Sequence, residues 1–275
     1  MKLYEKKGWK HPKKGKFGVE IEVESSRVNF CGILTPSGWS TTEDHSLRNA
    51  YNLEYVFLRP YSYKTSVEKI EQLQEVFDVE GDATQTPSIR TGVHVHLNVT
   101  DYTASQLARI VLVYMSMERV LTRYCGEDRT GNLFCLRVCD CPSMVSLVKG
   151  CMESGDWFSS IPQDTYKYSA LNLSTLSKHG SLEFRALRTP QRLSGIVEWL
   201  DIISAIEEYA LKLESLQTIP YDMSYYSPDT WVRKVLGEEL FKKVQYDEMD
   251  KDVRADMRNI QVLYHTEVKE FSNDY

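Results

Sequence analysis

Three short segments in which apolar and polar residues alternate strictly constrain the fold of this chain more than any other feature. They read FGVEIEVES at Phe17–Ser25, GVHVHLNV at Gly92–Val99 and SLEFRAL at Ser181–Leu187. Successive side chains on a β-strand point to opposite faces, so this alternation separates an apolar face from a polar one. The pattern therefore predicts three half-buried strands whose polar faces carry different chemistry.

The other segments predict a sheet packed with helices. Further strands are predicted at Leu53–Leu58 and at Tyr168–Ser174, the latter forming a hairpin with Ser181–Leu187 around Lys178-His179-Gly180. Apolar residues at helical spacing predict helices at Thr65–Val79, from Asp101 or Thr103 to about Tyr124, at Pro142–Met152, at Arg192–Leu213 and, as short helices, beyond Pro228. Because no regular βαβ rhythm is present, we predict an α+β fold.

Length and charge limit the classes of protein to consider. A chain of 275 residues is within reach of one domain, and we expect residues 1–275 to form one, with 1–16 as a basic arm and about 190–275 as a helical C-terminal part. The net charge of −6 disfavours tight, sequence-independent binding of phosphate backbones by the whole chain. The arm is interpreted as a solvated, partly disordered segment or as an electrostatic guide for an anionic partner or ATP. Six of its lysines lie within a short stretch: Lys6, Lys7, Lys10, Lys13, Lys14 and Lys16.

The sequence predicts a cytoplasmic protein without a membrane partner. No stretch approaches the roughly 20 apolar residues of a membrane span, and the N-terminus lacks the apolar core of a signal peptide. The six cysteines are then expected to be reduced thiols. Cys135, Cys139 and Cys141 form a C-x3-C-x-C cluster, which is not a standard zinc spacing, so we interpret them as structural thiols.

The polar faces of the three alternating strands differ in a chemically selective way. They carry Glu20, Glu22 and Glu24 on the first strand, His94 and His96 on the second, and Glu183 and Arg185 on the third. Each face alone could be an ordinary solvated strand face. Taken together, carboxylates and imidazoles suit divalent metals, while a guanidinium suits phosphate. The H-x-H pair also occurs in zinc hydrolases, but the abundance of glutamates favours magnesium or manganese.

The ordered segments FGVEIEVE, EDHSL, LEYVFLRP, TGVHVHLNV, RTGNLFC, YSALNLS and SLEFRALR resemble the phage and bacterial amidoligase family. That family belongs to the glutamine synthetase and glutamate–cysteine ligase superfamily. The resemblance spans roughly Phe17 to Arg188 and implies a glutamine synthetase-like fold with a curved, mainly antiparallel sheet. Beyond about Pro190 the chain contains no recognised signature.

The resemblance also implies roles for individual residues. The implied metal ligands are Glu20, Glu22, Glu54, His94 and Glu183. The implied catalytic residues are Glu20, His96, Glu183 and Arg185, of which His96 approaches the ATP phosphates and Arg185 clamps the transferred phosphate. The implied nucleotide contacts also include Arg129, Asn132 and Asn172. Asp44 and Arg59 are candidate substrate contacts. Glu24 is interpreted as the solvent-facing end of its strand.

The activity implied by the resemblance is ligation of a carboxylate to an amine, using ATP and Mg2+ or Mn2+ through an acyl-phosphate intermediate. The partners would be small-molecule or peptide substrates, and a modified nucleotide or nucleic acid acceptor would also fit. The alternatives are a metal-dependent hydrolase that uses the H-x-H strand, a phosphotransferase, and a non-catalytic binding module on the same fold. The sequence does not specify the oligomeric state.

Overall fold

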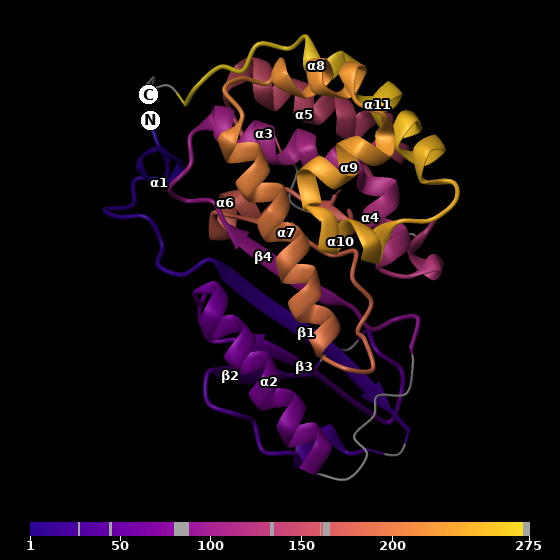
Figure 1. Cartoon of the computed structure of the whole chain (residues 1–275). Helices are drawn as coiled ribbons and strands as arrows, with labels where there is room; N and C mark the ends of the chain where they lie inside the picture. The colour runs from indigo at the N-terminus through magenta and orange to yellow at the C-terminus, as the bar shows by residue number, and fades with distance from the viewer. Residues whose placement is uncertain are drawn as a thin grey trace. The chain divides into compact units, whose positions relative to one another are not determined.

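The computed structural model describes residues 1–26, 28–43, 46–79, 88–132, 135–159, 161 and 166–271. These residues form two compact units. The sheet unit comprises residues 14–98 and 183–200, and the helical unit comprises residues 1–13, 99–182 and 201–275. Helices and an antiparallel sheet occur together, so the predicted α+β class is confirmed (Figure 1). No helix within the described ranges is long and apolar enough to cross a membrane.

Six strands are hydrogen-bonded in the order β2-β3-β1-β4-β6-β5. They are β1 (Phe17–Ser25), β2 (Trp39–Thr42), β3 (Tyr51–Phe57), β4 (Val93–Asn98), β5 (Leu171–Asn172) and β6 (Ser181–Phe184). The pairs β2–β3, β3–β1 and β1–β4 are all antiparallel. The alternating segment at Phe17–Ser25 therefore becomes the strand that lies between β3 and β4.

The apolar face of this sheet is covered by helix α2 (Tyr63–Val79), as Figure 1 shows. Phe77 of α2 packs its ring 5.5 Å from that of Tyr55 on β3 and 5.9 Å from that of Phe30 in the short turn η1 (Phe30–Gly32). Ile21 lies directly opposite Tyr55 in the β1–β3 register and is fully buried. Burying these side chains stabilises the unit by about 1.5–3 kcal/mol each. The core thus fixes which residues of β1 face the other way.

The helical unit is built mainly from helices of 4 to 16 residues. Its helices are α1 (Leu3–Lys6), α3 (Ala104–Met115), α4 (Glu118–Tyr124), α5 (Pro142–Ser154), α6 (Thr175–His179), α8 (Thr218–Tyr225), α9 (Pro228–Leu236), α10 (Glu238–Val244) and α11 (Met249–Tyr264). Helix α7 (Ser194–Lys212) begins in the sheet unit and ends in the helical unit. Trp231 of α9 is fully buried, and its indole N–H donates to Ser116 Oγ at 3.1 Å.

Two element predictions are wrong in detail. The predicted hairpin between Tyr168–Ser174 and Ser181–Leu187 contains helix α6, which leaves β5 only two residues long. The helix predicted to run to about Tyr124 is broken into α3 and α4, because Met117 has φ −137° and ψ 20°. In both places the local backbone conformation differs from the one that the residue pattern predicts.

The start of the chain is also more ordered than predicted. Leu3 is fully buried, and its N–H donates to the carbonyl of Tyr102 at 2.9 Å. The N–H of Tyr4 donates to the carbonyl of Thr100 at 2.8 Å. The first part of the predicted arm therefore packs on the residues that follow β4, and it is not a freely solvated segment.

Candidate functional site

The register of the sheet places the acidic and imidazole side chains of three strands on one face. Glu20 of β1 lies opposite His94 of β4, and Glu22 lies opposite Glu54 of β3. Residues paired across antiparallel strands project to the same side, so the polar faces predicted from alternation form one surface. This surface is the face of the sheet opposite to α2.

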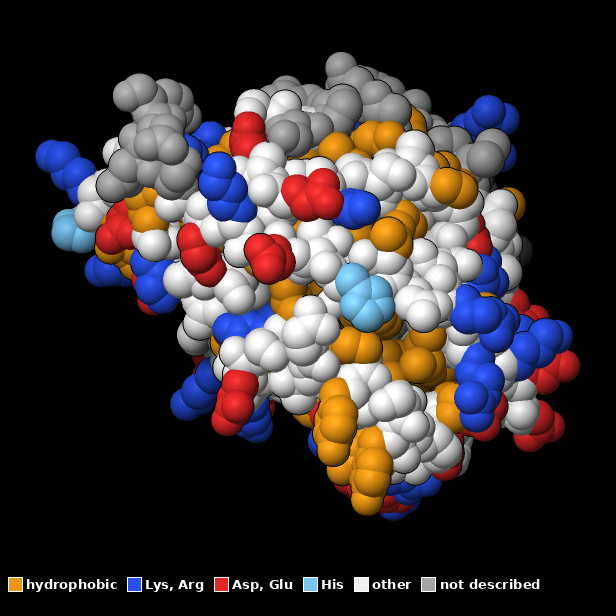
Figure 2. Space-filling view, turned by 90° about the horizontal axis from the view of Figure 1, so that it is seen from above, with side chains coloured by type: hydrophobic (Ala, Val, Ile, Leu, Met, Phe, Trp, Pro, Cys, Tyr) orange, Lys and Arg blue, Asp and Glu red, His pale blue; other side chains and the backbone are white. Residues whose placement is uncertain are grey.

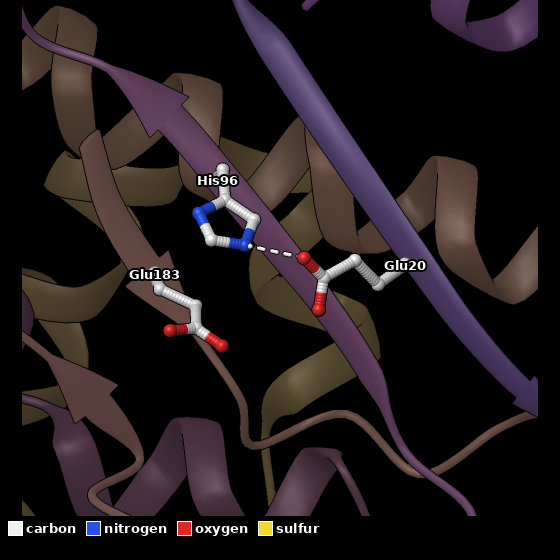
Figure 3. A group of neighbouring side chains, drawn as sticks. All are labelled: Glu20, His96 and Glu183. Carbon is white, nitrogen blue, oxygen red and sulfur yellow. Dashed lines mark hydrogen bonds and ion pairs between the residues drawn. The ribbon is translucent and has the colours of Figure 1, made fainter. Parts of the chain in front are cut away.

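Glu20 is at the centre of the group. One carboxylate oxygen lies 3.1 Å from His94 Nδ1, and the other lies 3.1 Å from His96 Nε2. Figure 3 shows Glu20, His96 and Glu183 projecting toward one another from β1, β4 and β6. The side chains of Glu20 and His96 are 28% and 14% exposed, so these two members of the group are partly accessible to solvent.

Two sets of three side chains in this group bring potential metal-binding atoms close together. One set is Glu20, His96 and Glu183, and the other is Glu20, Glu54 and His94. Within each set one ligand atom from every residue lies within 4.8 Å of the others. Glu20 belongs to both sets, so its two oxygens could serve two neighbouring cations.

Glu22 is held in place by backbone and imidazole contacts. One of its oxygens accepts a hydrogen bond from the N–H of Gly92 at 2.7 Å, and the other lies 3.7 Å from His94 Nε2. Sequence reasoning missed the contribution of Gly92, because a backbone donor leaves no signature in residue type. This donor fixes the orientation of a carboxylate that is only 12% exposed.

Glu183 and Arg185 form a buried ion pair beside the imidazoles. Arg185 Nη1 donates to Glu183 Oε1 at 2.5 Å and lies 3.3 Å from His94 Nδ1. The side chain of Glu183 is 4% exposed, and that of Arg185 is 18% exposed. The guanidinium therefore lies at the edge of the carboxylate group with part of its surface accessible.

The charges in this group are mutually dependent. Burial alone would raise the pKa of the Glu20 carboxyl, but hydrogen bonds from His94 and His96 hold it well below its ordinary value. Burial would lower the pKa of His96, yet Glu20 and Glu183 raise it. Burial would likewise raise the pKa of Glu183, but Arg185 and the two histidines lower it. The carboxylates are thus ionised, which is the form that binds cations.

Glu24 has a different environment from the other glutamates of β1. Its carboxylate accepts hydrogen bonds from the N–H groups of Arg48 and Asn49, both at 3.1 Å, and from the hydroxyl of Ser88. The residue is 2% exposed, so the interpretation of Glu24 as a solvent-facing strand end is wrong. It holds the segment before β3 and the segment before β4 against β1.

The remaining predicted contacts lie beside Tyr61, in the helical unit or outside the described residues. Arg59 is exposed and lies over the ring of Tyr61 at 5.5 Å, and Asp44 lies outside the described residues. The predicted nucleotide contacts Arg129, Asn132 and Asn172 belong to the helical unit. Asn172 is buried and accepts hydrogen bonds from the N–H and hydroxyl of Ser174, at 2.9 and 2.7 Å.

Comparison with known protein families gives a match. A family model with the description "Putative amidoligase enzyme" matches residues 40–188, which is more than half of the chain. No curated protein matches the chain. The matched span includes Glu54, both histidines, Glu183 and Arg185, whereas Glu20 precedes it. The structure places Glu20 in contact with those matched residues.

Proposed function

The chain belongs to the amidoligase enzyme family, and from this premise we propose that it is an ATP-dependent ligase that joins a carboxylate to an amine with the help of Mg2+ or Mn2+. One observation supports the cation requirement above the others: two sets of metal-type ligands share the single carboxylate of Glu20. The surrounding charges and contacts support the other parts of the proposal.

The side chains fit hard divalent cations. The described sets contain glutamate oxygens with one imidazole each, and neither contains a cysteine. Mg2+ and Mn2+ prefer such oxygen-rich surroundings and complete their shells with water and phosphate oxygens. Glu20, Glu54 and His94 would hold one cation, and Glu20, His96 and Glu183 the other. Bound cations would neutralise the negative charge of the phosphates of ATP.

Arg185 is the residue best suited to bind the transferred phosphate. Its guanidinium is fixed on one side by Glu183, which leaves other N–H groups of the fork available for a ligand. Phosphoryl transfer spreads negative charge over the transferring oxygens, and a fixed guanidinium stabilises that charge. We therefore propose that Arg185 mainly stabilises the transition state of phosphoryl transfer and contributes less to cation binding.

Activation of the carboxylate explains why such a site is needed. A carboxylate does not condense with an amine in water without activation. Attack of the substrate carboxylate oxygen on the γ-phosphorus of ATP forms an acyl phosphate and releases ADP. Attack of the neutral amine on the acyl carbon then forms the amide, releases phosphate and leaves one proton to be removed. The substrates proposed for this reaction are small-molecule or peptide carboxylates and amines.

A coupled assay tests this proposal. The protein is incubated with ATP, Mg2+ and pools of carboxylates and amines, and ADP release is measured. We expect release to require both pools, and the product to weigh one water less than the sum of its substrates. Hydroxylamine replaces the amine in a parallel reaction, because it traps an acyl phosphate as a hydroxamate.

Two variants test whether ADP release depends on the candidate metal site. Glu20→Gln should abolish ADP release, whereas Glu71→Gln, which changes an exposed carboxylate on α2 of the same unit, should leave it unchanged. Hydrolysis of a substrate without ATP would instead favour the alternative of a metal hydrolase built on His94 and His96. ADP release that needs no carboxylate would also contradict the proposal.

A further inference from the structure

A strongly basic segment at the start of the chain is not used by the proposed ligase site. The first 16 residues contain seven lysines and one glutamate, a net charge of +6, while the whole chain has a net charge of −6. Residues 17–275 therefore carry a net charge of −12. Such separation of charge is typical of a protein that contacts an anionic partner through one region.

The structure holds the part of this segment that belongs to the helical unit in a defined conformation. Besides the backbone bonds of Leu3 and Tyr4, the N–H of Lys13 donates to Thr100 Oγ1 at 2.9 Å. Trp9 packs on Gly180, where an added Cβ would lie 2.8 Å from the indole ring. An ordered segment loses less conformational entropy when it binds than a free arm would.

The lysines of this part differ in exposure, and Lys6 and Lys7 are half-buried. Lys10 and Lys13 are exposed, as is His11 between them. Lys7 Nζ lies over the ring of Phe158 at 5.1 Å and Lys13 Nζ over the ring of Trp9 at 4.9 Å, so aromatic rings hold these two ammonium groups in place. In Figure 2 basic side chains project from the left edge of the view, the side on which the N-terminal segment lies in Figure 1.

These observations favour a nucleic acid over a membrane surface. Binding to a lipid surface requires exposed apolar side chains that enter the interface. The segment offers none of this kind, because Leu3 is fully buried and Trp9 is only partly accessible. Closely spaced ammonium groups without an apolar anchor suit a phosphate backbone, where binding arises from the release of counterions.

We propose that the segment Lys6–Lys13 is a nucleic-acid-binding surface that contacts the phosphate backbone without reading base sequence. Lys6, Lys7, Lys10 and Lys13 would neutralise phosphates. The interaction is independent of the ligase reaction, because it requires neither ATP nor a divalent cation. It would bring the protein to nucleic acid, whatever the substrates of the ligase site are.

Fluorescence anisotropy with labelled 20-nucleotide single-stranded and double-stranded DNA tests this proposal, with EDTA present and ATP absent. We expect the affinity to fall steeply as salt rises from 50 to 200 mM and to be the same for oligonucleotides of unrelated sequence. The triple variant Lys6→Gln, Lys10→Gln, Lys13→Gln should bind at least about tenfold more weakly at 100 mM salt. In a plot of log K against log salt, its slope should be shallower by about 2.7 for the double-stranded DNA and by about 2.1 for the single-stranded DNA.

A matched control removes the same charge elsewhere in the helical unit. The variant Lys242→Gln, Lys243→Gln, Lys251→Gln should bind like the unchanged protein. The single variant Lys10→Glu serves as a second test, since its exposed side chain leaves folding unaffected, and it should weaken binding about threefold or more. Absent binding at 50 mM salt, or equal loss in both triple variants, would overturn the proposal. So would binding to phosphatidylserine vesicles without binding to DNA.

Discussion

At the scale of single residues, Glu20 and Glu24 show how two identical side chains on one strand face acquire different roles. Glu20 contacts two imidazoles at a partly open surface, whereas Glu24 is buried against backbone N–H groups. The sequence pattern treats them alike because alternation reports the face of a strand, not what covers it. The two glutamates differ because the segments around Arg48 and Ser88 cover Glu24. Neither segment has a regular alternation of apolar and polar residues that would predict this.

The two glutamates should therefore respond differently to removal of their charge. Glu20→Gln should abolish the rise in melting temperature produced by Mn2+, because cation binding stabilises the folded state only where its ligands are intact. Glu24→Gln should retain that rise but lower the free energy of unfolding by about 1–3 kcal/mol, since a neutral oxygen would replace the charged one that accepts from both buried N–H groups. Thermal unfolding with and without Mn2+ measures both. Equal loss of the Mn2+ effect in both variants would contradict the distinction.

Replacement of Arg185 tests its assignment to the phosphate. Arg185→Lys keeps the positive charge beside Glu183 but loses the planar fork, so kcat should fall about a hundredfold. Stabilisation by Mn2+ should remain, which separates this variant from Glu20→Gln. Arg192→Lys is the control, because Arg192 is an exposed partner of Asp78 in the same unit. An unchanged kcat for Arg185→Lys would refute the assignment.

Glu118 of the helical unit predicts a dependence of stability on pH. It is fully buried, and burial raises the pKa of its carboxyl to about 7. Its stabilising contribution is therefore complete below pH 4.5 and lost as the pH rises through 7. Glu118→Gln should be more stable than the unchanged protein at pH 8, by on the order of 3 kcal/mol, and similar to it at pH 4.5. Urea unfolding at both pH values measures this difference, and an equal difference at both would contradict it.

At the scale of secondary structure, alternation predicted two strands of the site well, whereas the strand predicted at Ser181–Leu187 ends at Phe184 and leaves Arg185 beyond it. The strand predicted at Phe17–Ser25 has the same bounds in the structure, and the one at Gly92–Val99 differs by one residue at each end. Both are long enough for the period of two to be unambiguous. Helix α6, by contrast, spans only Thr175–His179 and depends on the left-handed conformation of Gly180, which short-range apolar spacing does not reveal.

Gly180 links this short helix to the basic segment. It has φ +68°, and an added Cβ would lie 2.5 Å from Thr100 Cγ2 and 2.8 Å from Trp9 Cζ3. Gly180→Ala should thus lower the free energy of unfolding by about 1–3 kcal/mol and change the fluorescence of Trp9. Gly150→Ala is the control, because Gly150 lies within helix α5 with no atom within 4 Å of the added Cβ, and it should be neutral or slightly stabilising. A stable Gly180→Ala variant would contradict this account.

At the scale of the whole molecule, the ligands of the candidate site all belong to one of the two units. Hydrogen exchange should therefore show Mn2+ protecting the backbone of β1, β3 and β4 more than that of α9, α10 and α11. The reason is that ligand binding suppresses local opening where the ligand makes its contacts. Glu20→Gln should remove this protection. Uniform protection across both units would show that the cations bind elsewhere.

Sequence alone predicts which side chains lie on the polar face of each strand, but not which of them are neighbours across strands. Each alternating segment places its own glutamates, histidines or arginine on one strand face, and these faces form one surface only if the three strands lie in one sheet. The sequence does not give the cross-strand register that puts Glu20 beside His94, since register depends on pairing between segments far apart in the chain. The relation of Arg129, Asn132 and Asn172 to this face stays a prediction.

In β1 the residues of the core and the residues of the chemistry are immediate chain neighbours. Inserting or deleting one amino acid before Glu20 would exchange the two sets, burying carboxylates under α2 and exposing Val19 and Ile21 to water. Such a change would damage folding and function together. Changes in what this protein acts on are therefore expected from substitutions at single positions and from the loops between strands. Insertions or deletions within β1 are not expected to be tolerated.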